Sequence, residues 1–173
     1  VGLSTALTIR CDYKNQDFYG LGSVQSCIVI ECNFDESEFV SQITRRKSPS
    51  KKYNKRFTSD NILGISFKNC RSLNFIPQNL LEHFPNFIAL EFFNNNITTL
   101  MNYELQNYED LQSIRIMMQP IEHIPGDFFS NNPNLQVIDF SYNRIKSIGN
   151  NLLNSLYNLN RADFTNNICI NEN

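Results

Sequence analysis

The sequence predicts an α/β solenoid with one short strand in each coil and a β-hairpin cap before the first coil. Three observations predict it: a 24-residue repeat, a two-residue alternation inside each repeat, and three cysteines ahead of the repeats. The repeats begin at Phe87, Leu111, Leu135 and Leu159, which are evenly spaced. A repeat of this length predicts a stack of similar units, each of which contacts mainly its neighbours.

Each repeat carries apolar residues at positions 1, 4 and 6. The apolar side chains at positions 4 and 6 are Leu90 and Phe92, Ile114 and Ile116, and Ile138 and Phe140. Spacing of two residues places both on one buried face of a strand. An amide follows at position 9, as Asn95, Gln119, Asn143 and Asn167. We expect this amide to bond backbone groups that the turn would otherwise leave unpaired inside the stack.

An earlier copy of the pattern, at Ile62, Ile65, Phe67 and Cys70, precedes the other four. Together these spacings resemble the L-x-x-L-x-L-x-x-[N/C]-x-L signature of leucine-rich-repeat proteins over residues 62–169. The resemblance implies a curved, right-handed coil with a parallel sheet on its concave side. It also implies recognition of proteins or glycans, frequently in innate immunity or at cell surfaces. The departure is that Leu is often replaced by Phe, Ile or Tyr; the chain has 14 Phe and no Trp.

Apolar residues recur after each amide and again near the end of each coil. The first set is Leu73 and Ile76, Ile97 and Leu100, Ile121 and Ile124, and Ile145 and Ile148. The second set has helix-like spacing and comprises Leu81 and Phe84, Leu105 and Tyr108, and Leu153 and Leu156. The first set extends the apolar core, and the second predicts short helical segments on the side opposite the sheet.

The chain therefore divides into a cap with a basic loop, residues 1–61, and a solenoid of about five coils, residues 62–173. Within the cap, residues 6–9 and 26–30 are strand candidates, and residues 20–23 supply Gly-containing turn chemistry between them. An antiparallel hairpin covering the open apolar end of the first coil is expected. The segments 11–13, 20–22 and 26–29 also resemble the amino-terminal region of secreted insect leucine-rich-repeat proteins.

Five cysteines are present, at positions 11, 27, 32, 70 and 169. Extracellular solenoids often carry a disulfide-stapled cap, and the pairing we favour is Cys11–Cys27 with Cys32–Cys70. The alternative for Cys70 is a free buried thiol, because Cys commonly replaces Asn at position 9. Cys169 is then left over, as a buried thiol, an intermolecular bridge or the partner of a cysteine outside this sequence. No Cys/His cluster with metal-ligand spacing occurs, so no metal site is predicted.

The cap cysteines, together with a start at Val1 that has neither an initiator Met nor a signal peptide, predict a processed, secreted protein. The triplet Asn96-Ile97-Thr98 is an N-glycosylation sequon beside a turn. No apolar run approaches the ~18 residues of a membrane span. With a net charge of −2, nothing indicates a nucleic-acid partner.

Residues 35–60 are expected to form a solvated loop between cap and coils. Seven basic residues gather there: Arg45, Arg46, Lys47, Lys51, Lys52, Lys55 and Arg56. The other interpretations are a docking site for a sulfated glycan or an acidic partner, and a protease cleavage site at residues 45–47.

Side chains at positions 5 and 7 of each strand point out of the core by alternation. At position 5, Glu91, Arg115 and Asp139 alternate in charge and are predicted to pair across neighbouring strands. At positions 7 and 8, an apolar cluster is predicted on the concave face: Phe93, Met117, Met118 and Tyr142. An aromatic and methionine cluster ringed by charge is typical of the centre of a protein interface. The alternative is that neighbouring loops partly cover it.

No phosphate loop, nucleophile elbow or paired-carboxylate motif appears, so neither catalysis nor a cofactor is predicted. The main hypothesis is a secreted, non-enzymatic recognition module that binds a protein through its concave face, with innate immunity as the process that the resemblance implies. The alternatives are a self-associating structural or extracellular-matrix protein, which dimerises through the concave cluster or the last coil, and a glycan-binding protein that uses the basic loop.

Overall fold

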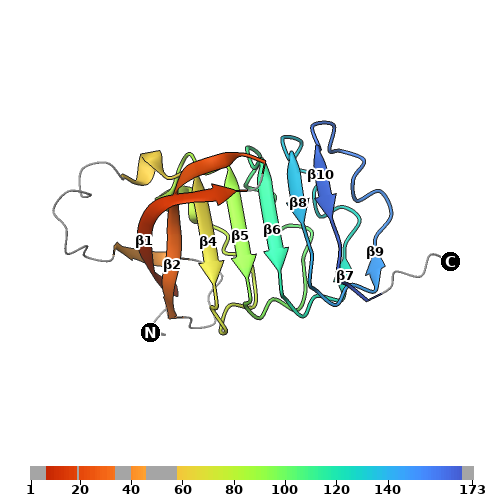
Figure 1. Cartoon of the computed structure of the whole chain (residues 1–173), viewed down its shortest axis with the longest axis horizontal. Coiled ribbons are helices and arrows are strands. Elements are labelled where there is room, and N and C mark those ends of the chain that lie inside the picture. Colours follow the sequence, from red (N-terminus) through yellow and green to blue (C-terminus); the bar gives the residue numbers. More distant parts are fainter. Residues whose placement is uncertain (1–6, 19, 34–39, 46–57, 169–173) are drawn as a thin grey trace, which may run out of the picture.

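The computed structural model describes residues 7–18, 20–33, 40–45 and 58–168 (Figure 1). Eight strands form the main sheet in the order β10-β8-β6-β5-β4-β2-β1-β3. Their bounds are β1 Leu7–Phe18, β2 Gly22–Asn33, β3 Val40–Arg45, β4 Gly64–Lys68, β5 Ala89–Phe93, β6 Ser113–Met117, β8 Val137–Asp139 and β10 Arg161–Asp163. The remaining elements are a 3-10 turn η1 Ser59–Asn61, a helix α1 Leu80–His83, and a second, two-stranded sheet of β7 His123–Ile124 and β9 Ser147–Ile148.

The predicted solenoid is confirmed. Strands β4, β5, β6, β8 and β10 run parallel, so four turns of coil separate the first from the last. The register places Leu90 beside Ile114 and Ile114 beside Ile138, which is the repeat read from the sequence. All three side chains are fully buried. The stack thus buries one apolar stripe per coil, and each coil covers the stripe of its neighbour.

The sequence predicts that each position-9 amide bonds the backbone of its own turn. In the structure these amides also bond the neighbouring coil, and so they form a ladder along the stack. Asn143 Oδ1 accepts the Gln119 N–H of the preceding coil at 2.7 Å, and its Nδ2 donates to the Ile116 and Phe140 carbonyls at 2.7 and 2.8 Å. The Asn95 side chain likewise accepts the Cys70 N–H at 2.8 Å. The amides therefore satisfy backbone groups that the turn places in the dry interior.

The predicted helical segments are wrong in all but one coil among the described residues. Only α1 is an α-helix, and the equivalent segments of later coils are turns. Leu81 and Leu153, which belong to the helix-like pairs, are exposed, and their neighbours Leu80 and Leu152 are buried. A segment this short gains little from helical hydrogen bonds, so packing of the stack decides which side chain points inward.

The predicted hairpin is present but much longer than expected, because β1 and β2 each span 12 residues and pair antiparallel along most of that length. In its middle, over Ser26–Val29, β2 pairs in parallel with β4 and so extends the solenoid sheet. The buried Ile9 and Val29 cover the apolar end of the first coil. The loop predicted for residues 35–60 is also corrected, because β3 lies inside it and pairs in parallel with β1.

Two disulfides staple this end, in the pairing that the sequence favours. Cys11–Cys27 joins the two strands of the hairpin, with 5.2 Å between Cα atoms. Cys32–Cys70 joins β2 to the turn after β4, with 5.8 Å between Cα atoms. Cys70 is therefore bonded, and the alternative of a free thiol in the position-9 slot is wrong. Cys169 lies outside the described residues.

Candidate recognition surface

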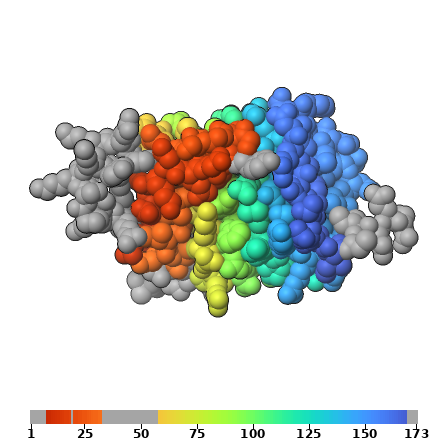
Figure 2. Space-filling model, in the orientation of Figure 1, coloured from red at the N-terminus to blue at the C-terminus, as the bar shows by residue number. Residues whose placement is uncertain are grey.

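The distal half of the hairpin lies across the concave face of the sheet (Figures 1 and 2). We call residues 12–18 and 20–25 the arm. From the amino-terminal end of the stack, where β2 pairs with β4, the arm turns toward β6 and β8. Figure 2 shows it covering the upper part of the face and leaving the lower ends of the strands open.

Three contacts fix the position of the arm. At Gly64 on β4, an added Cβ would overlap the Phe18 ring and lie 2.7 Å from Ser26 Oγ, so the missing side chain makes room for Phe18. Farther along, the Gln16 side chain donates to Glu91 on β5 at 3.0 Å. At the tip, Gly20 lies against the side chain of Val137 on β8, and a Cβ at Gly20 would lie 3.9 Å from the Val137 Cβ.

The arm explains which outward-pointing side chains are buried. At position 3, Ala89, Ser113 and Val137 point out of the core, yet Val137 is 3% exposed and the other two are completely covered. Arg161, at the same position of the next coil, lies beyond the tip, and its side chain is 44% exposed. Strand alternation therefore gives the direction of these side chains, and the arm decides their exposure.

The predicted charge ladder is present at position 5. Arg115 Nη1 lies 2.9 Å from Glu91 Oε2, and Arg115 Nε lies 3.3 Å from Asp139 Oδ2. All three side chains are largely buried, which is not expected for an exposed ladder. The ladder is therefore a partly desolvated ionic network beneath and beside the arm, where ion pairs are less screened than on an open surface.

Glu91 is the centre of this network. Its carboxylate also accepts hydrogen bonds from Ser66 Oγ at 2.6 Å and from Gln16, and Lys68 Nζ lies 3.0 Å away. Burial raises the pKa of Glu91, but the Ser66 hydrogen bond and the charges of Lys68 and Arg115 outweigh that effect, so its pKa lies below the usual value. Gln16 and Lys68 are missing from the predicted network. Lys68 could have been found from the repeat, because it lies on the neighbouring strand two residues after Ser66, the register partner of Glu91. Nothing in the sequence links Gln16 to Glu91.

Asp139 and Asp163 share a structural role at the ends of their strands. Asp139 Oδ1 accepts the Ser141 N–H and hydroxyl at 3.0 and 2.6 Å. Asp163 Oδ1 accepts the Thr165 N–H and hydroxyl at 3.0 and 2.7 Å, and these bonds lower the pKa of Asp163. Both carboxylates therefore close local turns, and neither is positioned as a paired acid and base.

The lower ends of the strands are open. We call Lys68, Phe93, Met118 and Tyr142 the open strip; they lie on four successive strands or on the turns directly after them. Met118 is 42% exposed and Tyr142 is 55% exposed. Met117 is predicted to belong to this apolar cluster, but it is only 9% exposed, and its sulfur lies 3.5 Å from Arg115 Nη2. The prediction that Met117 is exposed on this face is therefore wrong.

Position 8 has a left-handed backbone in every coil. The residues there have φ between 53° and 59°: Asn69, Asn94, Met118, Tyr142 and Asn166. Asn tolerates this conformation best among residues other than Gly, and a bulky side chain is strained in it. Three coils therefore carry the residue that the backbone favours, and the third and fourth coils carry the large side chains of Met118 and Tyr142 instead.

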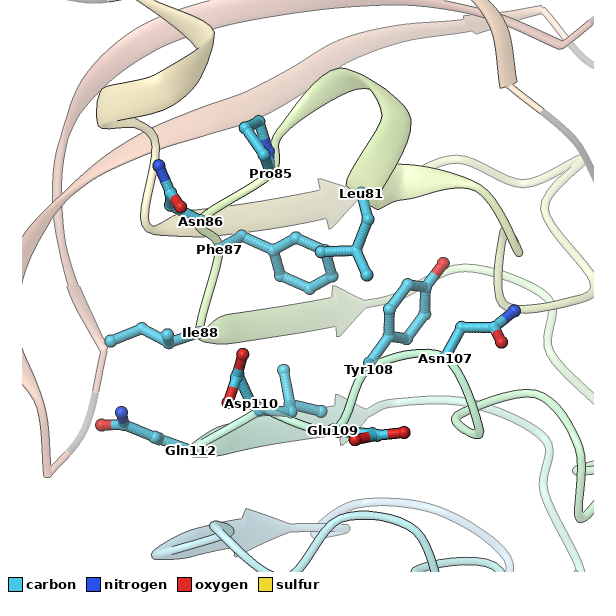
Figure 3. Close-up of a pocket in the computed structure, with 11 residues that line it drawn as sticks. Leu81, Pro85, Asn86, Phe87, Ile88, Asn107, Tyr108, Glu109, Asp110 and Gln112 are labelled. Carbon is cyan, nitrogen blue, oxygen red and sulfur yellow. The ribbon is translucent and has the colours of Figure 1, made fainter.

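One pocket of about 390 Å³ lies at the amino-terminal ends of β5 and β6, opposite the end where the open strip lies (Figure 3). It is lined by Leu81, Pro85, Asn86, Phe87, Ile88, Asn107, Tyr108, Glu109, Asp110, Leu111 and Gln112. Burial raises the pKa of Tyr108, and its hydroxyl donates to the Pro77 carbonyl and accepts the Leu80 N–H, so this group is occupied in holding the coil. The pocket lining contains no Lys, Arg, His or Cys that could act as a base or nucleophile beside the two acids.

The other predicted sites have separate outcomes. Asn96 is exposed, as an acceptor for a glycan needs to be. Arg45 ends β3, whereas Arg46, Lys47, Lys51, Lys52, Lys55 and Arg56 lie outside the described residues. Within the described ranges, no group of three or more His, Cys, Asp or Glu residues could hold a metal ion. No helix in the same ranges is long and apolar enough to cross a membrane.

This geometry defines a class, the parallel-sheet solenoid with one strand per coil. The sequence profile of the leucine-rich-repeat family matches residues 109–167. This match and the five parallel strands of the stack together support a leucine-rich-repeat fold.

Among solved structures, a chain of the Toll–Spatzle complex, described as a molecular hub in Drosophila development and innate immunity, has a similar fold. The TM-score is 0.54 with 20% sequence identity, and the match covers 69% of this chain and 16% of that one. No curated protein matches the sequence. The likeness shows the fold, and this chain spans about a sixth of the length of that neighbour.

Proposed function

We propose that this protein is a non-enzymatic, extracellular recognition module that binds a protein partner through the open strip. One observation carries the proposal: Met118 and Tyr142 present large exposed side chains from left-handed backbone positions that other coils give to Asn. Such strain costs about 1–2 kcal/mol per residue, and folding alone offers no compensation for it when the side chain is in water.

The surroundings of the strip support the same function. Lys68 is paired with Glu91, and the Arg115 charge is shared between Glu91 and Asp139, so the charges beside the strip are largely neutralised inside the protein. Removing the strip from water would therefore desolvate few unpaired charges. Exposed aromatic and methionine side chains with a polar rim are the composition typical of an interface centre.

We propose an extracellular location because the protein contains disulfide bonds, which form in oxidising compartments. Two disulfides staple the cap, and such bonds are rare in reducing compartments. The exposed Asn96 sequon fits passage through the secretory pathway, and we propose that it is glycosylated. A part in innate immunity is proposed by fold analogy alone.

The test replaces both strained residues by the one that other coils use. The double variant M118N/Y142N should fold at least as well as the wild-type protein and should capture its partner from native extracellular fluid at least about 10-fold more weakly. Y157N is the matched control, because Tyr157 is 89% exposed, lies outside the strip, and should leave capture unchanged. Equal capture of the partner by the wild-type protein and by the folded double variant would show that the open strip is not the binding surface.

Self-association through the last coil is the second candidate. Phe164 and Leu159 are half-buried, whereas Phe140 and Leu135, their equivalents one coil earlier, are fully buried. Among the described strands, β10 forms the edge of the sheet beside them. If this face pairs two copies, light scattering at high concentration should show a dimer that Phe164→Glu disrupts, and a monomer at all concentrations would exclude it.

Glycan binding by the basic segment also remains a proposal. It predicts salt-sensitive retention on heparin, because the attraction between such charges is screened by salt. Deleting residues 46–56 should abolish that retention. Retention by the deletion variant would assign the effect to another surface.

A further inference from the structure

We propose that the concave face beneath the arm is a second binding site, occupied here by the protein's own arm. The site fits an extended segment of another protein that presents an amide donor and, two residues later, an aromatic ring. Its two subsites lie at positions 3 and 5 of the strands, whereas the exposed apolar residues of the open strip lie at positions 7 and 8. Lys68, which pairs with Glu91, is the one residue that belongs to both surfaces. The arm provides the chemistry of the ligand, because Gln16 and Phe18 already fill the two subsites.

The aromatic subsite is centred on Gly64. The Phe18 side chain is completely buried although Phe18 is the last residue of its strand. Any side chain at position 64 would overlap the ring, so the slot exists because β4 begins with Gly. The equivalent residues of the next three coils are Ala89, Ser113 and Val137, each of which adds a Cβ. The first coil alone has room for a ring.

The polar subsite is the Glu91 carboxylate. Ser66, Lys68 and Arg115 fix both of its oxygens, and Gln16 adds a hydrogen bond at 3.0 Å from the side of the face that the arm covers. An amide N–H from another chain could replace that of Gln16 without moving the three partners. The carboxylate is therefore pre-organised as an acceptor in a nearly dry setting, where a hydrogen bond to a charged group is strong.

The attachment of the arm is suited to exchange. The backbone pairing between β2 and β4 covers Ser26–Val29, in the middle of β2, and one further bond runs from the Leu63 N–H to the Gln25 carbonyl at 2.8 Å. Along the arm, Lys14, Asn15 and Asp17 face solvent. Two polar atoms in the covered region, Gln25 Oε1 and Ser113 Oγ, are buried without a hydrogen-bond partner, which weakens the closed arrangement.

The arm is also built to move as one unit. The Cys11–Cys27 disulfide joins its two strands near the base, beside a register shift between Arg10 and Cys11. Lifting the arm about that point would uncover Ala89, Ser113 and Val137 together, while β2 stays paired with β4. A partner segment could then take the slot at Gly64 and the acceptor at Glu91.

Thiol labelling tests whether the arm lifts. Val137 lies under the tip, and Ile138, the next residue, lies in the core, so V137C and I138C form a matched pair. If the arm opens without global unfolding, V137C should react with a maleimide at least about 10-fold faster than I138C. Low urea should leave the V137C rate nearly unchanged. Equal rates that rise together with urea would overturn the proposal.

A probe peptide tests the site itself. The probe is residues 10–28 closed by the Cys11–Cys27 disulfide, and the receptor is the full chain carrying Phe18→Ala, which weakens its own arm. The receptor should bind the probe, and a probe with Phe18→Ala should bind at least about 10-fold more weakly. A probe with Lys14→Ala is the control and should bind unchanged. No binding by the folded receptor, or equal binding of the first two probes, would contradict the proposal.

A variant whose arm is held closed by a disulfide tests whether the probe and the arm occupy the same site. In the double variant G20C/V137C, the two Cβ atoms would lie about 3.9 Å apart, within the range of a disulfide. This variant should lose binding of the probe, whereas M118N/Y142N should retain it, so the two surfaces are tested separately. Mixing the single variants G20C and V137C should yield no disulfide dimer. A dimer would make a second copy the occupant and overturn the assignment to a different protein.

Discussion

The two halves of the concave face differ although the same strands build them. In the upper half, Ser113 and Val137 lie under the arm and are almost inaccessible. In the lower half, Met118 and Tyr142 are open to solvent. Alternation along a strand determines where a side chain points, but only tertiary structure determines whether it can meet a partner. Met117 and Met118 show this in adjacent residues, since the first is covered and the second exposed.

The halves also differ in what their residues contribute to stability. The covered half contributes apolar burial at Phe18 and a compensated ionic network at Glu91, both of which favour the folded state. The open half holds two bulky residues in a left-handed backbone, which favours unfolding. Substitutions should therefore have opposite effects on stability in the two halves.

The largest effect is expected at the centre of the covered half. Phe18→Ala removes a completely buried ring and should lower the free energy of unfolding by about 3–5 kcal/mol, measured by urea titration. Lys14→Ala, on the exposed side of the same strand, should change it by less than about 0.5 kcal/mol. Equal effects of the two substitutions would show that the arm does not pack on the face.

A smaller effect is expected from Glu91→Gln, about 1–3 kcal/mol, because the substitution removes the charge that Lys68 and Arg115 compensate. The pKa of Glu91 is lower in the folded state than in the unfolded chain. The stabilisation from this group is therefore complete above the unfolded pKa, near 4.5, and is lost as pH falls through the folded value.

Urea titrations at several pH values below neutrality test the sign of this effect. The wild-type protein should lose stability more steeply than Glu91→Gln as the pH falls below about 4.5. Glu109→Gln is the matched control, because Glu109 is exposed, and it should retain the wild-type slope. A Glu91→Gln slope as steep as that of the wild type would contradict the pKa assigned to Glu91.

Substitutions in the open strip should have the opposite sign. Met118→Asn and Tyr142→Asn should each raise the free energy of unfolding by about 1 kcal/mol, because Asn suits the left-handed backbone better. The reverse change at an equivalent position, Asn94→Met, should lower it by a similar amount. Thermal unfolding measures all three, and a loss of stability in both Asn variants would mean that these side chains pack on the protein.

The smallest effect is expected beyond the tip of the arm. Arg161 and Asp163 form an ion pair at 2.9 Å, but the Arg161 side chain is well exposed. Arg161→Ala should therefore change the free energy of unfolding by about 0.5 kcal/mol or less. Arg115→Ala, within the covered network, should cost clearly more. Similar costs for both would remove the distinction between the covered network and the surface pair.

The sequence predicts the solenoid well because every coil has to meet the same packing and hydrogen-bonding requirements. One coil must bury the same stripe and satisfy the same turn as the next, so the burial of Leu90, Ile114 and Ile138 follows from spacing alone. The spacing also predicts that the position-9 amides bond backbone groups, but it does not predict that these bonds join neighbouring coils. The disulfide pairing was predicted from the likeness to capped extracellular solenoids, although the sequence left Cys70 open between a disulfide and a free thiol. The convex side is less predictable, because short turns there can point either Leu80 or Leu81 inward.

The arm could not be predicted, because its residues 14–17 are polar and show no strand alternation. Its position depends on a long-range fit of Phe18 to Gly64 and of Gln16 to Glu91, which no local pattern encodes. The ladder at position 5 was accessible to sequence reasoning, but its burial was not. The left-handed backbone at position 8 was hidden because two of its five residues are not the Asn that would mark it.

Side-chain footprinting of the native protein tests the two-halves account most directly. Met117 and Met118 should differ sharply in their rate of oxidation by peroxide, with Met118 the faster by at least about 10-fold. Hydroxyl-radical labelling should likewise modify Tyr142 and spare Phe18. Equal oxidation of the two methionines would contradict the covered position of Met117, and labelling of Phe18 at the rate of Tyr142 would show that the arm does not cover the concave face.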